Sequence, residues 1–469
     1  MRLVKLEDTT RLHNSTERLG TDPLGKLILR LSLPSIASMV TASLYNLVNA
    51  FWVAKLGYQA IAAVTVVMPF FVFCMALGVG TGIGVNALTS RRLGENNTEG
   101  ANQAVGQIFF LSIILGAVFL FLTNSFPGII LNICGITPDI MDMGTRYITV
   151  LGWGIPLFLF NIICRNVFAA SGDTVRPMAF AITSQVINVI LDPFLIFGWG
   201  IFPEMGVSGA ALATVISMTV GAALPLWYIL RKKTAYNLRF RHCIPNYAVI
   251  KEIFRVGLPS MLIEATESVL FAILNNVVAT FGSVALAAMG IFGRLLDLVY
   301  MPVIGTSHGL LPIIGFSFGA KRWDRLWGAV KLTITWLSII LLVMFILLEI
   351  FTPHVIKLFN SDPELLQIGI PGMRIILASM VFWGFPIIII TTFQGLSKGK
   401  DAMVLSLVRQ FLFFVPFLFL FKHLWGITGM WVAMPVSDLL GGTIAGLWLW
   451  REYIKQKNSG LWSNSAAIK

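Results

Sequence analysis

The chain has little charge. Charged residues make up 12% of its 469 positions and hydrophobic residues 57%, whereas soluble domains average about 25% charged residues. This composition excludes disordered chains and ordinary soluble globular domains, and it leaves a polytopic membrane protein. At ~20 apolar residues per span, the length accommodates roughly twelve membrane helices. The apolar runs are continuous rather than alternating, which argues against a barrel of strands.

Motifs that would indicate an enzyme or a powered pump are absent from the sequence. The four cysteines, Cys74, Cys134, Cys164 and Cys243, have no CxxC spacing, so we expect free thiols without a disulfide framework. There is no phosphate-binding loop and no HExxH motif, and we therefore expect no enzyme and no cofactor. No selectivity-filter repeat or arginine-rich helix is present. A secondary transporter driven by an ion gradient is the class that remains.

Positive charge lies between the apolar runs rather than within them. The net charge of +12 is therefore interpreted as an orientation signal and not as a nucleic-acid-binding surface. Alternate linkers are basic, which predicts a multi-pass protein of the cell membrane with both termini in the cytoplasm. The first apolar run begins near Ile28 after a charged stretch, so we expect no cleavable signal peptide.

An internal repeat runs through the chain. RLSLPS at 30–35 resembles RVGLPS at 255–260, an offset of 225 positions, the difference between 259 and 34. The same offset relates Gly57 to Gly282 and Gly94 to Gly319, and it slips to 220 between Gly206 and Gly426. These matches predict an all-α protein of two six-helix lobes in a parallel repeat. The predicted segments are a cytoplasmic N-terminal segment (1–27), an N-lobe (28–230), a basic cytoplasmic linker (231–252), a C-lobe (253–451) and a cytoplasmic tail (452–469).

Asp192 is an acidic residue inside the fifth apolar run. Ionisable residues at this depth are costly and indicate function by default. Asn188 lies one helical turn earlier on the same face, and Pro193 frees the carbonyl of Val189. A carboxylate, an amide oxygen and a free carbonyl suit a monovalent cation, and the carboxylate alone suits a proton. The alternative is that Asp192 only hydrogen-bonds a neighbouring helix.

The seventh and eighth runs carry further charged residues. Glu264 and Glu267 are three positions apart and can face one cavity, where they could take up protons or attract an organic cation. Pairing of Glu264 with an arginine is the structural alternative. Arg294 and Asp297 have the same spacing, and we interpret them as a structural ion pair.

Several short segments together match one family. They are 33–34 leading to 44–49, 90–94, 172–173, 188–193, 206–211 before Thr214, and 257–260. In these segments the chain resembles the multidrug and toxic compound extrusion (MATE) family, most closely its DNA-damage-inducible-type branch, from about Leu24 to Arg451. The resemblance implies two six-helix lobes around a V-shaped central cleft. It also implies export of amphipathic, often cationic, compounds in exchange for protons or sodium.

The resemblance also assigns residues, with two departures. It implies a site for proton or sodium coupling at Asp192, Asn188 and Thr214, with Asn49 standing where that branch has an acid on the first span. Tyr147 and Asn161 match polar positions of the fourth span that line the cavity. Glu267, with Glu264 beside it, resembles an acid of the other branches and implies a substrate or second proton site. The tenth-span acid of those branches is absent, with Pro386 near its position.

The sequence therefore predicts a secondary active exporter of amphipathic, cationic compounds by alternating access. We expect it to act in the lipid bilayer as a monomer, without nucleic acid. One alternative is a lipid-linked precursor flippase of the same superfamily, which would need a basic cavity; Arg165, Arg294 and Arg409 lie in apolar runs. A channel or receptor is a further alternative.

Overall fold

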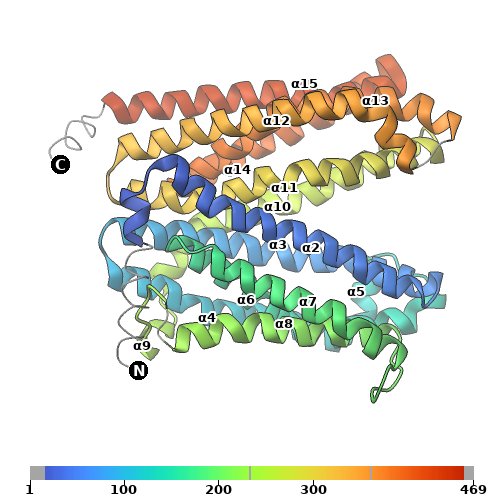
Figure 1. The fold of residues 1–469 in the computed structure, drawn as a ribbon, viewed down its shortest axis with the longest axis horizontal. Helices are drawn as coiled ribbons and strands as arrows, with labels where there is room; N and C mark the ends of the chain where they lie inside the picture. The colour runs from blue at the N-terminus through green and yellow to red at the C-terminus, as the bar shows by residue number, and fades with distance from the viewer. Residues whose placement is uncertain (1–15, 232–233, 360–361, 459–469) are drawn as a thin grey trace.

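The computed structural model describes residues 16–231, 234–359 and 362–458, and all regular elements among them are helical. The helices form two groups that lie side by side, and α2 begins and α15 ends at the same end of the bundle (Figure 1). In the first half the helices are α2 (Leu24–Ala54), α3 (Tyr58–Gly94), α4 (Thr98–Ser125), α5 (Pro127–Ile133), the 3₁₀ turn η1 (Pro138–Ile140), α6 (Met141–Ala170), α7 (Val175–Phe197) and α8 (Val207–Leu230). After the connecting α9 (Phe240–Cys243), they are α10 (Tyr247–Ala279), α11 (Ser283–Gly319), α12 (Trp323–Phe359), α13 (Pro363–Gly395), α14 (Gly399–Leu407), the π-helix η2 (Val408–Phe414) and α15 (Val415–Asn458).

The number of membrane spans agrees with the prediction of about twelve. Within the described residues, 11 helices are long and apolar enough to cross a membrane. The last of these, Gly399–Asn458, contains a break at Gly426, where φ is 61° and ψ is −136°. Because a helix cannot continue through that backbone conformation, this stretch supplies two spans.

Helix bounds differ from the predicted segments at the polar ends. α10 begins at Tyr247, inside the predicted linker, because the Asn246 side chain caps it by accepting hydrogen bonds from the backbone N–H groups of Ala248 and Val249. Residues 16–21 are already helical. Apolar length alone gives the lipid-spanning part of a helix, whereas capping residues decide where it begins.

The internal repeat is confirmed by the backbone of the turns. Gly57 and Gly282 have φ values of 107° and 97°, and Gly206 and Gly426 have 55° and 61°. These conformations are ones that side chains disfavour, so the glycines are required there. Two further pairs of residues 225 positions apart both have positive φ values. They are Asn96 with Lys321 (57° and 56°) and Gly172 with Ser397 (81° and 59°).

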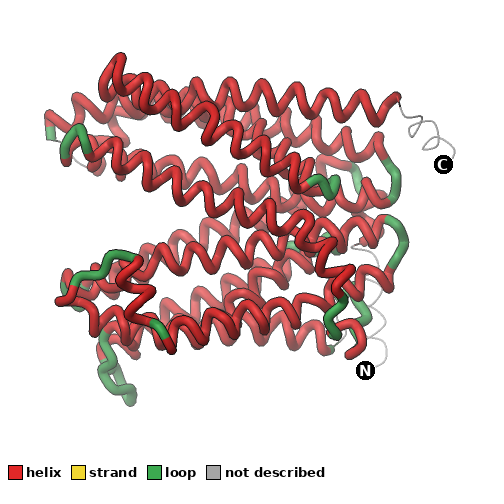
Figure 2. Tube along the Cα trace, turned by 180° about the vertical axis from the view of Figure 1, so that it is seen from behind, coloured by secondary structure: helices red, strands yellow, loops and turns green. Residues whose placement is uncertain are grey.

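The two halves meet along a seam of close backbone contacts. Each contact occurs twice, because equivalent glycines of the two repeats each approach the backbone of the other half. A Cβ added to Gly94 on α3 would overlap the carbonyl oxygen of Phe316 on α11, and a Cβ added to Gly319 would overlap that of Arg91. Figure 2 shows the two groups of helices separating toward the end opposite the termini. The same reciprocity continues along the seam: Gly80 and Gly84 approach α10 at 253–261, and Gly305 and Gly309 approach α2 at 31–36.

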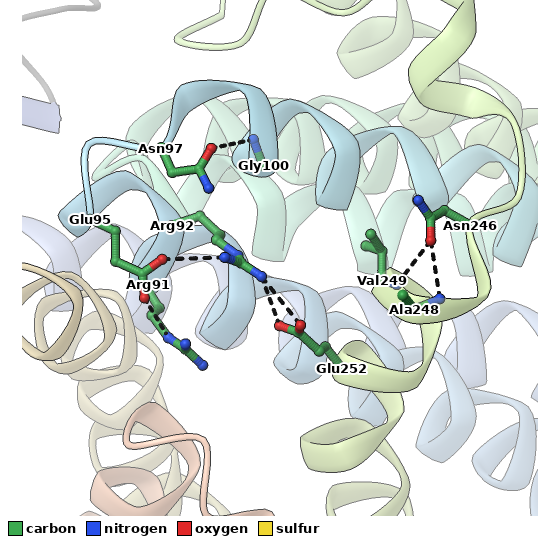
Figure 3. A network of polar contacts seen from close by, with 9 residues as sticks. All are labelled: Arg91, Arg92, Glu95, Asn97, Gly100, Asn246, Ala248, Val249 and Glu252. Carbon is green, nitrogen blue, oxygen red and sulfur yellow. Dashed lines mark hydrogen bonds and ion pairs between the residues drawn. The ribbon is translucent and has the colours of Figure 1, made fainter.

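Charged side chains surround the seam at the end of the termini. Arg92 Nη2 on α3 lies 3.1 Å from Glu252 Oε2 on α10, joining the two halves (Figure 3). Arg91 and Arg92 also bind Glu95 at 2.8 and 3.4 Å. These contacts place oppositely charged groups where α3, α4 and α10 converge.

Each half also holds the segment that leads into the other half's first helix. Arg325 of α12 donates to the carbonyl oxygens of Leu19 and Asp22, both at 2.7 Å. On the other side, Gln107 of α4 donates to the carbonyl oxygens of His242 and Ile244, at 2.9 and 3.0 Å. We call residues 16–22 and 237–246 the two leading segments. The first leads into α2 of the first half but is held by the second half, and the second leads into α10 of the second half but is held by the first half.

The seam yields a first prediction. Gly94→Ala should destabilise the protein by about 1–3 kcal/mol, because its methyl group would meet backbone that cannot yield. The matched control is Gly290→Ala on α11, where an added Cβ has open space and alanine favours the helix. Thermal unfolding of the purified protein in detergent measures both. Equal midpoints for wild type and Gly94→Ala would contradict the description of the seam.

Candidate functional site

The first half contains a buried acid without hydrogen-bonding partners. Asp192 and Asn188 lie one turn apart on α7, and neither has any exposed surface. Neither carboxylate oxygen of Asp192 accepts a hydrogen bond from a described residue, and the same holds for the amide oxygen of Asn188. Three oxygens are thus buried together on one helix face without a donor. This is the feature that the spacing of these residues predicted.

Polar residues of three other helices surround these oxygens. The Asn188 amide donates to the hydroxyl oxygens of Thr214 (3.4 Å) and Ser217 (3.3 Å) on α8. On α2, Asn49 donates to the Tyr45 hydroxyl at 3.3 Å. Tyr45 in turn interacts with Thr214 and lies within electrostatic range of Asp192. Tyr147 of α6 is buried and lies within electrostatic range of both Tyr45 and Asp192. We call these residues the N-lobe cluster: Tyr45, Asn49, Tyr147, Asn188, Asp192, Thr214 and Ser217.

The four residues expected to couple cations, Asp192, Asn188, Asn49 and Thr214, therefore lie in one place. Tyr45, which the sequence analysis did not single out, links Asn49 to Thr214. Asn161 has a different role: its amide donates to the carbonyl oxygen of Gly221, joining α6 to α8. It ties two helices together and is not among the residues that interact with Asp192.

The chemistry of the N-lobe cluster is limited by desolvation. An ionised carboxylate buried without donors costs several kcal/mol, so a proton or a bound cation must accompany Asp192 in this conformation. The Thr214 hydroxyl donates to the Ala210 carbonyl oxygen and accepts from Asn188. The oxygens free to bind a hard cation are therefore those of Asp192 and Asn188, which are ligands of the right kind.

A second polar cluster lies within the other half. The carboxylate of Asp438 on α15 accepts from Arg409 Nη1 at 3.0 Å and from Trp383 Nε1 at 2.6 Å. The Tyr300 hydroxyl donates to Glu267 Oε1 at 3.4 Å, and its ring contacts that of Trp383 edge to face at 5.5 Å. Arg409 also lies within electrostatic range of Glu267, and Glu264 within that of Glu267. We call these six residues the C-lobe cluster.

The C-lobe cluster contains residues that the sequence analysis missed. Asp438, Trp383 and Tyr300 were not expected there, and Arg409 pairs with Asp438 and not with Glu264. The available signal was the isolated charge of Asp438 and of Arg409 in apolar runs. Arg409 lies in the π-helix η2, a distortion common at functional sites.

Comparison with known proteins shows the family of the chain. The MatE family model matches residues 34–194 and 259–420, two segments that begin 225 positions apart (34 to 259) and together cover more than half of the chain. The chain belongs to the MatE family. It is a membrane transporter of the MATE class and not an enzyme, as the sequence predicted. The DNA-damage-inducible-type branch stays a prediction.

Relatives of known name cover nearly the whole chain. The multidrug export protein MepA of Staphylococcus haemolyticus is 24% identical over 421 residues, 90% of this chain and 92% of its own. The FAD transporter of Shewanella oneidensis is 26% identical over 420 residues, with 90% and 93% covered. A solved outward-facing multidrug resistance MATE family transporter superposes with a TM-score of 0.88 at 27% identity, covering 95% of this chain and 99% of that one.

One expected feature of this MATE transporter does not form. Arg294 and Asp297 both lie on exposed parts of α11, and no ion pair joins them in the described structure. Their spacing allows a pair, but the two charged groups are not brought within ion-pair distance. The four cysteines are free, as predicted. No group of three histidine, cysteine or acidic residues that could hold a metal occurs among the described residues.

The two buried aspartates of the MATE fold should respond oppositely to amidation. Asp438→Asn should destabilise the protein by about 3–5 kcal/mol, because it leaves Arg409 buried without its counter-ion. Asp192→Asn removes no hydrogen bond and should leave stability unchanged or raised. Thermal unfolding of both variants in the same detergent tests this. A loss of stability in Asp192→Asn as large as in Asp438→Asn would mean that Asp192 has a structural partner.

Proposed function

We propose that the chain is a secondary active exporter of amphipathic, cationic compounds that works by alternating access. The observation that carries this proposal is Asp192, buried without a donor among oxygen-bearing side chains in a MATE fold. In this proposal a proton or a sodium ion at Asp192 is exchanged for substrate. Asn188 supplies a second oxygen, and Asn49 and Thr214 position the surroundings through Tyr45.

Burial supports the coupling role of Asp192. Because the carboxylate cannot stay charged and unpaired inside the lobe, occupation by a cation and closure around it are linked energetically. When the lobe opens to water, the carboxylate of Asp192 can be solvated, so it no longer needs a bound cation and the cation can be released. A site that needs its cation only when closed can thus exchange it once per transport cycle.

The C-lobe cluster supports a preference for cations. Asp438 pairs directly with Arg409, and Glu267 lies within electrostatic range of the same arginine. Glu264 lies within electrostatic range of Glu267. The remaining carboxylates can receive a proton or a substrate's positive charge. We therefore assign Glu267, with Glu264, to a substrate or second proton site, and Tyr147 and Asn161 to the polar wall of the N-lobe.

The relatives' names favour export of drugs but include other cargoes. The MepA proteins are multidrug export proteins, whereas the Shewanella protein is an FAD transporter. A Pyrococcus furiosus neighbour is described by the reverse polarity of its binding pocket, at a TM-score of 0.86 and 27% identity. A lipid-linked precursor flippase would need a basic cavity. Of the three arginines considered for it, Arg409 is neutralised by Asp438 and Arg294 lies on an exposed surface. Arg165 lines a pocket between the halves, outside both polar clusters.

We also propose the setting of this activity. The protein would work as a monomer in the plasma membrane, with both termini in the cytoplasm and no nucleic-acid partner. α2 begins and α15 ends at one end of the bundle (Figure 1). Arg325 lies at that end, where it binds the carbonyl oxygens of Leu19 and Asp22, and Arg91 and Arg92 lie in the last turn of α3. Positive charge concentrated there is typical of the cytoplasmic side.

The transport proposal predicts loss of ion-driven efflux in Asp192→Asn. Wild-type proteoliposomes should move ethidium under an imposed proton or sodium gradient, applied separately, and Asp192→Asn should reduce the driven rate at least about tenfold, since the amide can take up no proton and binds sodium without charge. Glu267→Gln should weaken transport less if it only binds substrate. The fluorescence of ethidium follows efflux.

Controls separate coupling from folding. Asp142→Asn breaks only an exposed ion pair with Arg146 on α6 and should transport as wild type. The transport result of Asp192→Asn counts when its thermal midpoint is at or above that of the wild type. Full ion-driven efflux by folded Asp192→Asn would refute the coupling role. No ethidium efflux by wild type under either gradient would refute this substrate class and move FAD and lipid-linked precursors to the next assays.

A further inference from the structure

A pocket on the seam contains an arginine that the transport proposal does not use. It is lined by side chains of α2, α6, α7 and α11 and by Thr174, which precedes α7. Arg165 of α6 makes no hydrogen bond or ion pair with any residue that the structure describes. An arginine within a membrane segment normally pairs with an acid or with backbone carbonyls. The polar lining of the pocket is Ser35, Ser38, Arg165, Asn166, Thr174 and His308.

The pocket holds donors and no acid. His308 of α11 lies within electrostatic range of Arg165. The Ser38 side chain of α2 also lines the pocket. The acids near this end are engaged elsewhere: Asp173 binds Arg176 at 2.8 Å, and Asp22 lies 4.0 Å from Arg30. An unpaired guanidinium beside an imidazole and a hydroxyl is a site for an anion.

We propose that this pocket binds a phosphate-type oxyanion, either free phosphate or the headgroup of an anionic phospholipid. The donors come from three helices, so an anion with several oxygens can engage Arg165, Ser38 and His308 together. The planar guanidinium matches phosphate oxygens in a bidentate fashion. This site is separate from both polar clusters and does not depend on the proposed export activity.

The pocket also spans the seam between the halves. Arg165 and Ser38 belong to the first half and His308 to the second. Beside it, Gly309 approaches Ser32 and Gly305 approaches Ile36. An anion bound to both halves therefore stabilises the seam in its closed arrangement. Ligands that bind only one conformation raise its stability by mass action.

The test is thermal unfolding of the full chain, purified in neutral detergent, with sodium phosphate titrated against sodium chloride at constant ionic strength and constant sodium. Phosphate should raise the midpoint of wild type, and chloride should not. Arg165→Gln should weaken the apparent phosphate affinity at least about tenfold, since it removes the charge-assisted bonds. The matched control is Arg146→Gln, an exposed arginine of the same helix paired with Asp142, which should respond as wild type.

A second arm identifies the source of the anion. The same proteins are compared in nanodiscs of phosphatidylcholine alone and of phosphatidylcholine with phosphatidylglycerol. Stabilisation by phosphatidylglycerol but not by free phosphate, lost in Arg165→Gln, supports the site and assigns it to lipid. If Arg165→Gln does not fold, the double variant Ser38→Ala with His308→Gln should weaken the phosphate response in its place. Absence of stabilisation in both arms, or an equal response of Arg165→Gln and Arg146→Gln, would overturn the proposal.

Discussion

Backbone contact between α3 and α11, permitted by glycine, is the constraint on which the rest of the structure depends. Gly94 and Gly319 are equivalent in the repeat, and each leaves room for a carbonyl oxygen of the other half. Small residues at helix crossings allow van der Waals contact along the backbone, which is the main attraction available between helices in lipid. Because the same contact occurs twice with its partners exchanged, the two halves are fixed about a pseudo-two-fold axis. The position of every polar residue follows from that arrangement.

The repeat determines the scaffold but not the chemistry inside it. The turns at Gly57 and Gly282 share their backbone conformation, yet the clusters within the two halves differ in kind. The N-lobe cluster has one acid and neutral oxygens around it, whereas the C-lobe cluster has three acids and Arg409. A buried carboxylate without a protein partner can exchange the proton or cation bound to it at low cost. A carboxylate paired with an arginine is held in place. The two lobes are thus built alike and suited to different tasks.

Sequence reasoning predicted the features that depend on local spacing. Asn188 and Asp192 share a helix face because they are four positions apart, and the turn glycines are required by a single backbone conformation. It missed the contact of Asp438 with Arg409 and Trp383, because those residues come from three helices and only their packing brings them together. It also predicted a pair of Arg294 with Asp297 that does not form. Spacing shows that two side chains can meet, but not that the helix turns them toward each other.

The energies along the seam suit a structure that opens and closes. Arg92 and Glu252 join the halves, but their side chains are 27% and 39% exposed, and such pairs contribute about 1 kcal/mol or less. The leading segments are held mainly through backbone carbonyls by Arg325 and Gln107, whose donors water can satisfy when the segments separate. Buried apolar side chains also meet across the seam, with Ile83 and Ala87 of α3 against Val256 and Leu311. A cation that must be present whenever a lobe closes around Asp192 shifts the balance between conformations by the difference in its affinity for them.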